Sequence, residues 1–157
     1  MLAAMISAAL LATGSFCLAD KEKAEKKDPL AAAKCPVSGK AVKADAFVEH
    51  NGGKVYFCCN NCPDAFKKDK DKFSVKVNHQ MAITEEAKQV KCPLTGKDVN
   101  PDTGIDVGGS KVAFCCNNCK GKVAKATGDD QLKLVFAKDP FEKAFKVGKA
   151  KAKAEKK

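Results

Sequence analysis

The sequence predicts an α+β fold made of two small tandem domains, each with a turn, a β-hairpin and an α-helix. Three observations support this prediction: a long internal repeat, apolar alternation around glycine-rich turns, and a cysteine-rich helix start. The chain has 157 residues, which suits one ordinary domain or two very small ones. Aromatic residues make up only 6% of it, so units this small usually need a metal ion or disulfides to fold stably.

The internal repeat has a period of 57 residues. It aligns residues 34–62 with 91–119 without a gap, and 16 of the 29 positions are identical. Two copies are too few for a solenoid. The repeat therefore predicts tandem domains at 34–75 and 91–147, joined by a linker at 76–90.

The elements of the first repeat follow in order. Residues 35–39 (CPVSG) predict a tight turn, because Pro and Gly both fit turn positions. Residues 47–50 and 54–57 predict two short strands around Asn-Gly-Gly, and the second repeat has Gly-Gly-Ser at that place. Asn60 or Asn61 is expected to cap a helix that continues through residue 66. The expected core residues are Val55, Phe57, Phe66, Phe73, Val112 and Phe114.

The flanking segments differ in composition from the repeats. Residues 20–33 form a charged leader, and residues 148–157 a basic tail that we expect to be disordered. A short helix is expected to begin at Thr84 in the linker, and residues 141–145 suggest a further helical piece.

The N-terminus predicts an export signal at residues 1–19. This segment has no charged side chain, and its apolar stretch is too short to form a stable membrane anchor. The tripeptide CLA at 17–19 places small side chains on either side of Leu at a cleavage site, whereas Phe16 argues against lipidation at Cys17. We therefore expect a periplasmic or secreted protein that retains eight of its nine cysteines.

The net charge of +10 comes from lysines spread along the chain. This favours solubility and a weak contact with anionic surfaces, and it lacks the interleaved aromatic residues of a nucleic-acid-binding patch. His50 and His79 have no counterpart in the other repeat, so we expect both at the solvated surface. No acid/base pair recurs with the repeats, so the sequence does not predict an enzyme.

The cysteine spacing suits a metal site. Cys58 and Cys62 are four residues apart at a strand-to-helix junction, where their side chains can converge. A helix N-terminus stabilises thiolate, the form that binds metal. The hairpin is long enough to bring Cys35 back to the same point, which is the plan of a treble-clef zinc finger.

The pattern C-x22-C-x3-C, with an aromatic residue following at Phe66, resembles the TRASH/YHS domains. The resemblance covers most of 34–75 and 91–119, and it implies a treble-clef-like module associated with heavy-metal sensing, trafficking or resistance. Two departures stand out. A zinc knuckle often has a second Cys where this chain has Ser38 and Thr95, and Cys59 and Cys116 stand where the family often has Ser.

We therefore hypothesise that the extra cysteine of each repeat completes a four-thiolate site. Four thiolates suit Zn²⁺, and three clustered thiolates also suit Cu⁺, so a three-thiolate site with one free Cys stays open. The candidate ligands are Cys35, Cys58, Cys59 and Cys62 in the first repeat and Cys92, Cys115, Cys116 and Cys119 in the second.

Two alternatives to metal capture remain. Exported chains with an even number of cysteines often carry structural disulfides. In the first alternative, disulfides or zinc merely stabilise a structural or protein-interaction module. The CxxC spacing from Cys59 to Cys62 also occurs in thiol oxidoreductases, although no βαβ pattern surrounds it here.

Overall fold

The computed structural model describes residues 28–148. The predicted export signal, residues 20–27 of the leader and residues 149–157 of the tail lie outside the described residues. The described part mixes helices and strands, which is compatible with the predicted α+β class. Among residues 28–148, no helix is both long enough and apolar enough to cross a bilayer.

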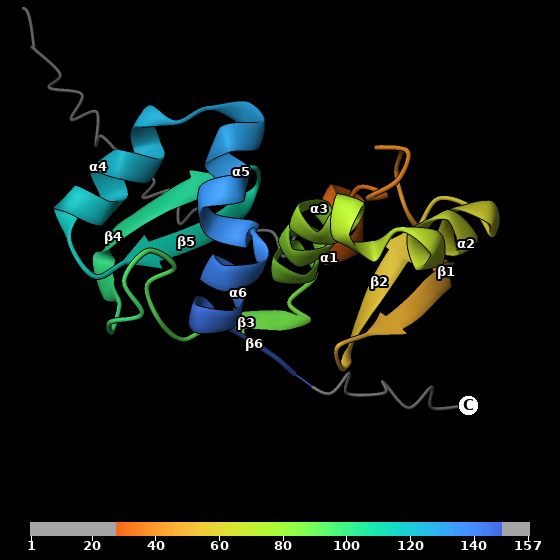
Figure 1. Cartoon of the computed structure of the whole chain (residues 1–157), viewed down its shortest axis with the longest axis horizontal. Helices are drawn as coiled ribbons and strands as arrows, with labels where there is room; N and C mark the ends of the chain where they lie inside the picture. Colours follow the sequence, from red (N-terminus) through yellow and green to blue (C-terminus); the bar gives the residue numbers. More distant parts are fainter. Residues whose placement is uncertain (1–27, 149–157) are drawn as a thin grey trace, which may run out of the picture.

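The first module, residues 29–83, places a hairpin between helices (Figure 1). Its elements are α1 (Pro29–Ala32), β1 (Lys43–His50), β2 (Gly53–Phe57), α2 (Asn61–Lys68) and α3 (Lys70–Ile83). The second module, residues 87–147, also has a hairpin followed by helices, and it has a short strand at each end. Its elements are β3 (Ala87–Gln89), β4 (Asn100–Val107), β5 (Ser110–Phe114), α4 (Asn117–Lys125), α5 (Gly128–Phe136), α6 (Lys138–Ala144) and β6 (Phe145–Val147).

The two hairpins have the same register once the 57-residue shift is applied. Lys43 pairs with Phe57 in one and Asn100 with Phe114 in the other, and each register slips immediately afterwards. Each hairpin turns through two residues with positive φ, which is the backbone that Asn-Gly and Gly-Gly adopt readily. The local sequence signal therefore located both hairpins correctly.

The predicted core residues are buried on one side of each hairpin. Val55, Phe57, Val112 and Phe114 are fully buried. The ring of Phe66 packs on Phe57, with 5.8 Å between their centroids. The core predictions are therefore confirmed for the hairpins and for α2, and Phe73 is partly buried against the same cluster. Asn60 is the N-cap residue of α2, but its side chain makes no capping hydrogen bond.

Helix α3 replaces most of the predicted linker. It extends to Ile83, and the predicted helix start at Thr84 is wrong: the Thr84 N–H donates to the Gln80 carbonyl and ends the helix. Asp69 caps its beginning, and no Gly or Pro interrupts it. The helix contacts β2 on one side and α5 and α6 on the other, so the two modules share one hydrophobic core (Figure 1).

The junction between the modules contains His79, which the sequence did not place there. Its ring packs at a tilt against Phe136 of α5, with 4.9 Å between the ring centroids. The 57-residue shift equates these two positions. The Nε2 atom of His79 is buried and has no hydrogen-bond partner. The expectation of a solvated surface histidine is wrong at this position, because the second module covers the ring.

Strands β3 and β6 close the second module. They pair antiparallel, from Ala87 with Val147 to Gln89 with Phe145. The predicted helical piece at 141–145 is confirmed up to residue 144, where α6 ends and β6 begins. Val147 also lies beside the turn of the first hairpin, because a Cβ atom built on Gly53 would stand 2.8 Å from its Cγ1 atom. The last described strand therefore contacts both modules.

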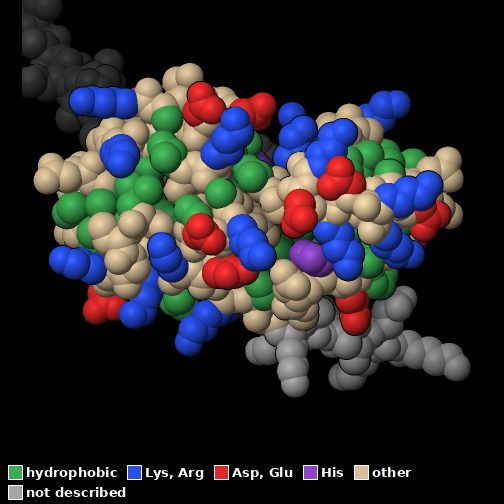
Figure 2. Space-filling model, in the orientation of Figure 1, with side chains coloured by type: hydrophobic (Ala, Val, Ile, Leu, Met, Phe, Trp, Pro, Cys, Tyr) green, Lys and Arg blue, Asp and Glu red, His purple; other side chains and the backbone are tan. Residues whose placement is uncertain are grey.

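The lysines are distributed over both modules. Figure 2 shows them scattered across the visible face, with acidic side chains between them. Two exposed ion pairs, Lys67–Asp64 and Lys133–Asp130, follow the i, i+3 spacing of a helix surface. This distribution agrees with the scattered charge in the sequence.

Candidate metal centre

The fold brings three cysteines of each module together. The Sγ atoms of Cys35, Cys58 and Cys62 all lie within 4.8 Å of one another. The Sγ atoms of Cys58 and Cys62 are 3.6 Å apart. Cys35 and Cys62 are buried and Cys58 is half-buried, so solvent reaches the cluster mainly at Cys58.

The second module repeats this cluster. Cys92, Cys115 and Cys119 also lie within 4.8 Å of one another, with 3.7 Å between the last two sulfurs. The burial of the three residues follows the same order as in the first module. The eight cysteines of residues 28–148 are all free thiols in the structure.

Turn geometry positions the first ligand of each cluster. The Cys35 N–H donates to the Lys40 carbonyl and the Gly39 N–H donates to the Cys35 carbonyl, both over 2.8 Å. Gly39 has φ 73°, which glycine adopts without steric cost. The second module makes the corresponding two hydrogen bonds through Cys92, again over 2.8 Å. The predicted tight turn is therefore confirmed in both modules.

A hydroxyl group stands beside each cluster where a zinc knuckle often has its second Cys. The Ser38 Oγ atom lies 3.1 Å from the Cys58 Sγ atom, and the Thr95 Oγ1 atom lies 3.3 Å from that of Cys115. The sequence identified both only as poor zinc ligands. Each can donate a hydrogen bond to a thiolate, and such contacts orient ligands and tune a metal site.

The extra cysteines lie at the exposed edge of each cluster. The Sγ atom of Cys59 lies 3.4 Å from that of Cys62 and 3.8 Å from that of Cys58. In the second module, the Sγ atom of Cys116 lies 3.7 Å from that of Cys115. Both are exposed, and neither belongs to the group of mutually close sulfurs. The structure therefore brings three of the four predicted ligands of each module together and leaves the fourth next to them.

Hydrogen bonding makes the first cysteine of each cluster acidic. Burial raises the pKa of Cys35, but hydrogen bonds from the Ser38 hydroxyl and nearby backbone N–H groups outweigh it, and the pKa falls to about 7. The pKa of Cys92 falls to about 7 in the same way, with Thr95 in the place of Ser38. Each centre thus contains one thiol that is readily available as thiolate at neutral pH.

The cysteine inside each helix start is less acidic than usual, because burial raises its pKa. Burial raises the pKa of Cys62, and the neighbouring thiols add to the rise. The pKa of Cys119 rises to about 12 for the same reasons. The helix N-terminus was expected to stabilise the thiolate at these positions, but burial dominates. A metal ion that enters the cluster must therefore displace protons from these thiols.

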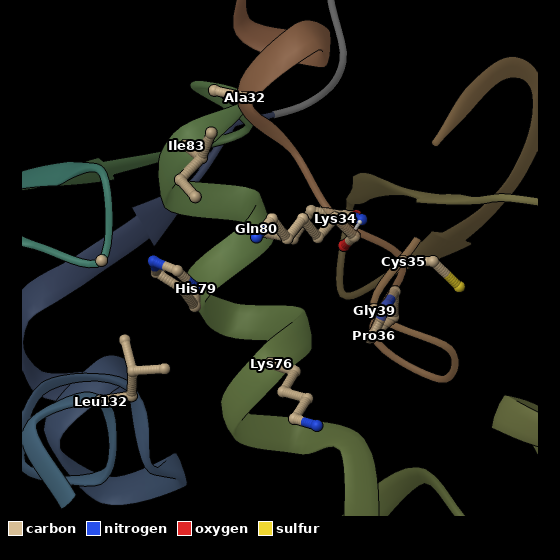
Figure 3. Close-up of a pocket in the computed structure, with 11 residues that line it drawn as sticks. Ala32, Lys34, Cys35, Pro36, Gly39, Lys76, His79, Gln80, Ile83 and Leu132 are labelled. Carbon is tan, nitrogen blue, oxygen red and sulfur yellow. Dashed lines mark hydrogen bonds between the residues drawn. The ribbon is translucent and has the colours of Figure 1, made fainter. Parts of the chain in front are cut away.

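The histidines lie outside both clusters. His50 packs edge-on against Phe66, with 5.3 Å between centroids, and His79 lies at the junction of the modules. A cavity of about 390 Å³ separates the Cys35 turn from α3, and Figure 3 shows the Cys35 sulfur pointing away from that helix. The cavity is therefore separate from the sulfur cluster.

The geometry of the clusters suits a thiophilic ion. Four thiolates at the usual Zn–S distance of about 2.3 Å lie about 3.8 Å from one another, and three in a plane about 4.0 Å. The measured separation of 3.6 Å between Cys58 and Cys62 is close to both values. Each cluster can therefore hold a metal ion with small side-chain movements.

Comparison with known proteins gives no match to this chain among family models, curated proteins or solved structures. The resemblance to the TRASH/YHS domains therefore stays a prediction from the sequence.

Proposed function

We propose that this is an exported metal-binding protein that captures or delivers a thiophilic ion through two centres. The observation that carries the proposal is the convergence of three sulfurs in each module, at Cys35, Cys58 and Cys62 and at Cys92, Cys115 and Cys119. Two clusters of the same design in one small chain favour metal binding over scattered structural thiols.

Zinc is the first candidate metal, with Cys59 and Cys116 as the fourth ligands. Zinc in structural sites takes four ligands. The Cys59 thiol lies next to two sulfurs of its cluster, and the Cys116 thiol lies next to one. Cu⁺ is the alternative, because three soft thiolates suffice for it.

We place each module among the treble-clef-like domains of the TRASH/YHS type. The order of turn, hairpin and helix around the sulfurs supports this assignment, as does the C-x22-C-x3-C spacing. The proposed location in the periplasm or outside the cell depends on the predicted signal at residues 1–19 alone.

Metal analysis combined with a free-thiol count tests the proposal. Mature protein isolated from its native compartment should contain two ions per chain, and the triple change Cys92→Ser, Cys115→Ser and Cys119→Ser should leave one. A chelator should remove the metal without unfolding the chain if the protein handles metal, whereas a structural ion leaves only on unfolding. Eight oxidised thiols with no metal would contradict metal binding.

The fourth-ligand proposal has its own test. Cys59→Ser should lower the zinc affinity of the first centre about tenfold or more and leave the second centre unchanged. Chelator competition measures both affinities. An unchanged affinity at the first centre would mean that three thiolates hold the ion and that Cys59 is a free thiol.

A thiol redox function is a second candidate, favoured by one observation. Hydrogen bonding to the Cys62 thiol lowers the pKa of the exposed Cys59, whereas the pKa of Cys62 is raised. An exposed acidic thiol beside a buried one is typical of CxxC oxidoreductases. Reduction of a model disulfide by the metal-free protein, lost in Cys59→Ser, would support this candidate.

A further inference from the structure

One buried glutamine side chain joins the cysteine turn of the first module to its hairpin. The Gln80 Oε1 atom accepts the Tyr56 N–H over 2.8 Å, and its Nε2 atom donates to the Tyr56 carbonyl over 2.8 Å. The same Nε2 atom donates to the Lys34 carbonyl over 2.9 Å. Figure 3 shows Gln80 reaching from α3 towards Lys34, the residue before Cys35. Both N–H donors of the carboxamide are therefore used.

The second module has the same arrangement around Gln89 of β3. The Gln89 Oε1 atom accepts the Ala113 N–H over 2.9 Å, and its Nε2 atom donates to the Ala113 carbonyl over 2.7 Å. Nε2 also donates to the carbonyl of Lys91, the residue before Cys92, over 3.0 Å. Three hydrogen bonds to three corresponding backbone groups thus recur in both modules.

The glutamines themselves do not correspond under the 57-residue shift. That shift relates Tyr56 to Ala113 and Lys34 to Lys91, but it takes Gln80 to an alanine of the second module, and Gln89 likewise falls on Ala32. One glutamine lies on a helix and the other on a strand. Two unrelated positions thus place a carboxamide on the same backbone atoms, which indicates that the arrangement meets a requirement of the module.

That requirement is the spacing between the metal ligands. The turn carries the first ligand, whereas β2 and β5 lead directly to the second, which lies two residues after Tyr56 or Ala113. Each of these strands has a neighbouring strand on one side only. The carboxamide occupies the free edge and holds the turn against it, so the sulfurs stay within reach of one ion.

We infer that Gln80 and Gln89 are positioning residues of the two metal centres, each acting through the backbone that carries its ligands. This inference rests on the proposed function. Gln80 is 2% exposed, so its hydrogen bonds do not compete with bulk water. Because residues that orient metal ligands typically change affinity 10- to 100-fold when replaced, the effect is measurable.

The test uses Gln80→Leu and Gln89→Leu in the full chain, with Cd²⁺ as the probe. The absorption band of the Cd²⁺–thiolate bond reports binding. To measure one centre alone, the three clustered cysteines of the other centre are changed to Ser. Gln80→Leu should weaken Cd²⁺ binding at the first centre about 10- to 100-fold and change the second less than about twofold. Gln89→Leu should have the reverse effect.

Asn78→Leu is the matched control. The Asn78 Nδ2 atom donates to the Phe136 carbonyl over 3.0 Å, so the change removes a buried amide of α3 that does not contact a cysteine turn. It should lower the midpoint of thermal unfolding while leaving both Cd²⁺ affinities unchanged. A general loss of stability therefore cannot reproduce the expected site-specific pattern.

Gln80→Glu covers the case in which Gln80→Leu does not fold. It keeps the acceptor for the Tyr56 N–H and loses both donors, so it should weaken the first centre alone. Equal losses at both centres, or no loss with two ions bound, would overturn the inference. A wild-type chain that binds no Cd²⁺ would overturn the proposed function and the inference together.

Discussion

At the scale of single residues, the hydroxyl groups of Ser38 and Thr95 show how a ligand position can change its role. Each stands where a zinc knuckle often has a cysteine. Each hydroxyl contacts a cysteine sulfur of its cluster. A hydroxyl there lowers the pKa of the first thiol without adding a fourth sulfur. Under the proposed function, the number of ligands in each centre depends on the adjacent exposed cysteine.

This dependence gives a prediction for a double variant. If Cys59 is the fourth zinc ligand, adding Ser38→Cys to Cys59→Ser should restore the zinc affinity of the first centre, since the Ser38 Oγ atom lies 3.1 Å from the Cys58 sulfur. We expect a recovery of about tenfold, equivalent to about 1.4 kcal/mol, by chelator competition.

Ser74→Cys in the same background is the control, because it adds a thiol on α3 outside the cluster. Equal recovery in the control would contradict the geometric explanation, since any extra thiol would then suffice.

At the same scale, the sequence predicted the clustering of the cysteines better than the residues that hold the clusters together. The spacing of Cys35, Cys58 and Cys62 follows from local turn and helix geometry, so the repeat alone identified it. Gln80 could not be predicted in its role, because its partners lie 24 and 46 residues away. Gln89, the corresponding residue of the second module, occupies a different repeat position, so the alignment of the repeats does not reveal it.

At the scale of elements, the hairpins were predictable and the connection between them was not. The hairpins have local signals: a glycine-rich turn flanked by alternating apolar residues. Helix α3 buries Val77 and Met81 together with two amides, Asn78 and Gln80. Because this buried face is wide and partly polar, the sequence lacks the narrow apolar stripe that usually predicts a helix. Strands β3 and β6 are also too short to stand out.

The contact between the first hairpin and β6 gives a stability prediction. A Cβ atom at Gly53 would lie 2.8 Å from the Val147 Cγ1 atom and 3.3 Å from the Glu86 Cβ atom. Gly53→Ala should therefore lower the free energy of unfolding by about 1–3 kcal/mol through overpacking. Chemical denaturation measures this change.

Gly121→Ala is the opposite case. Gly121 lies in α4, and an added Cβ atom there would meet nothing within 4 Å. This variant should raise the free energy of unfolding by about 0.5–1 kcal/mol, because alanine is the better helix former. If both variants destabilise the chain equally, the contact with Val147 does not explain the effect.

At the scale of the whole molecule, the two modules pack together around one hydrophobic core. α3 packs on both halves, and the repeat-equivalent residues His79 and Phe136 meet where the halves touch. The sequence gave no local sign of this junction, because a single histidine among polar residues is typical of a surface. Only the approach of the second module buries it.

Acid should therefore weaken the junction through His79. Burial lowers the pKa of His79 from its usual 6.5, against smaller opposing effects of the Val107 and Gly108 backbone and Asp106. Below about pH 6.5 the unfolded chain binds a proton that the folded chain does not bind until lower pH. The unfolded state then binds more protons, so the stabilisation present above pH 6.5 decreases as the pH falls.

His79→Gln measures this contribution. Between about pH 7.5 and pH 5, its free energy of unfolding should decrease less than that of the wild type, because the titrating group is gone. Comparison of the two slopes cancels any effect of metal binding common to both. His50→Gln is the control: burial and the charge of Lys70 also lower the pKa of His50, so this variant shows how much a histidine outside the junction changes the slope. Identical slopes in wild type and His79→Gln would rule out a role for His79.

The position of β6 has a consequence for the order in which the chain is made. Synthesis delivers the N-terminal half first, and domains usually fold in that order. Here the last described strand pairs with β3 and packs beside the turn at Gly53. The shared core is therefore completed only when residue 147 has emerged, and until then both thiol clusters belong to a partly open chain.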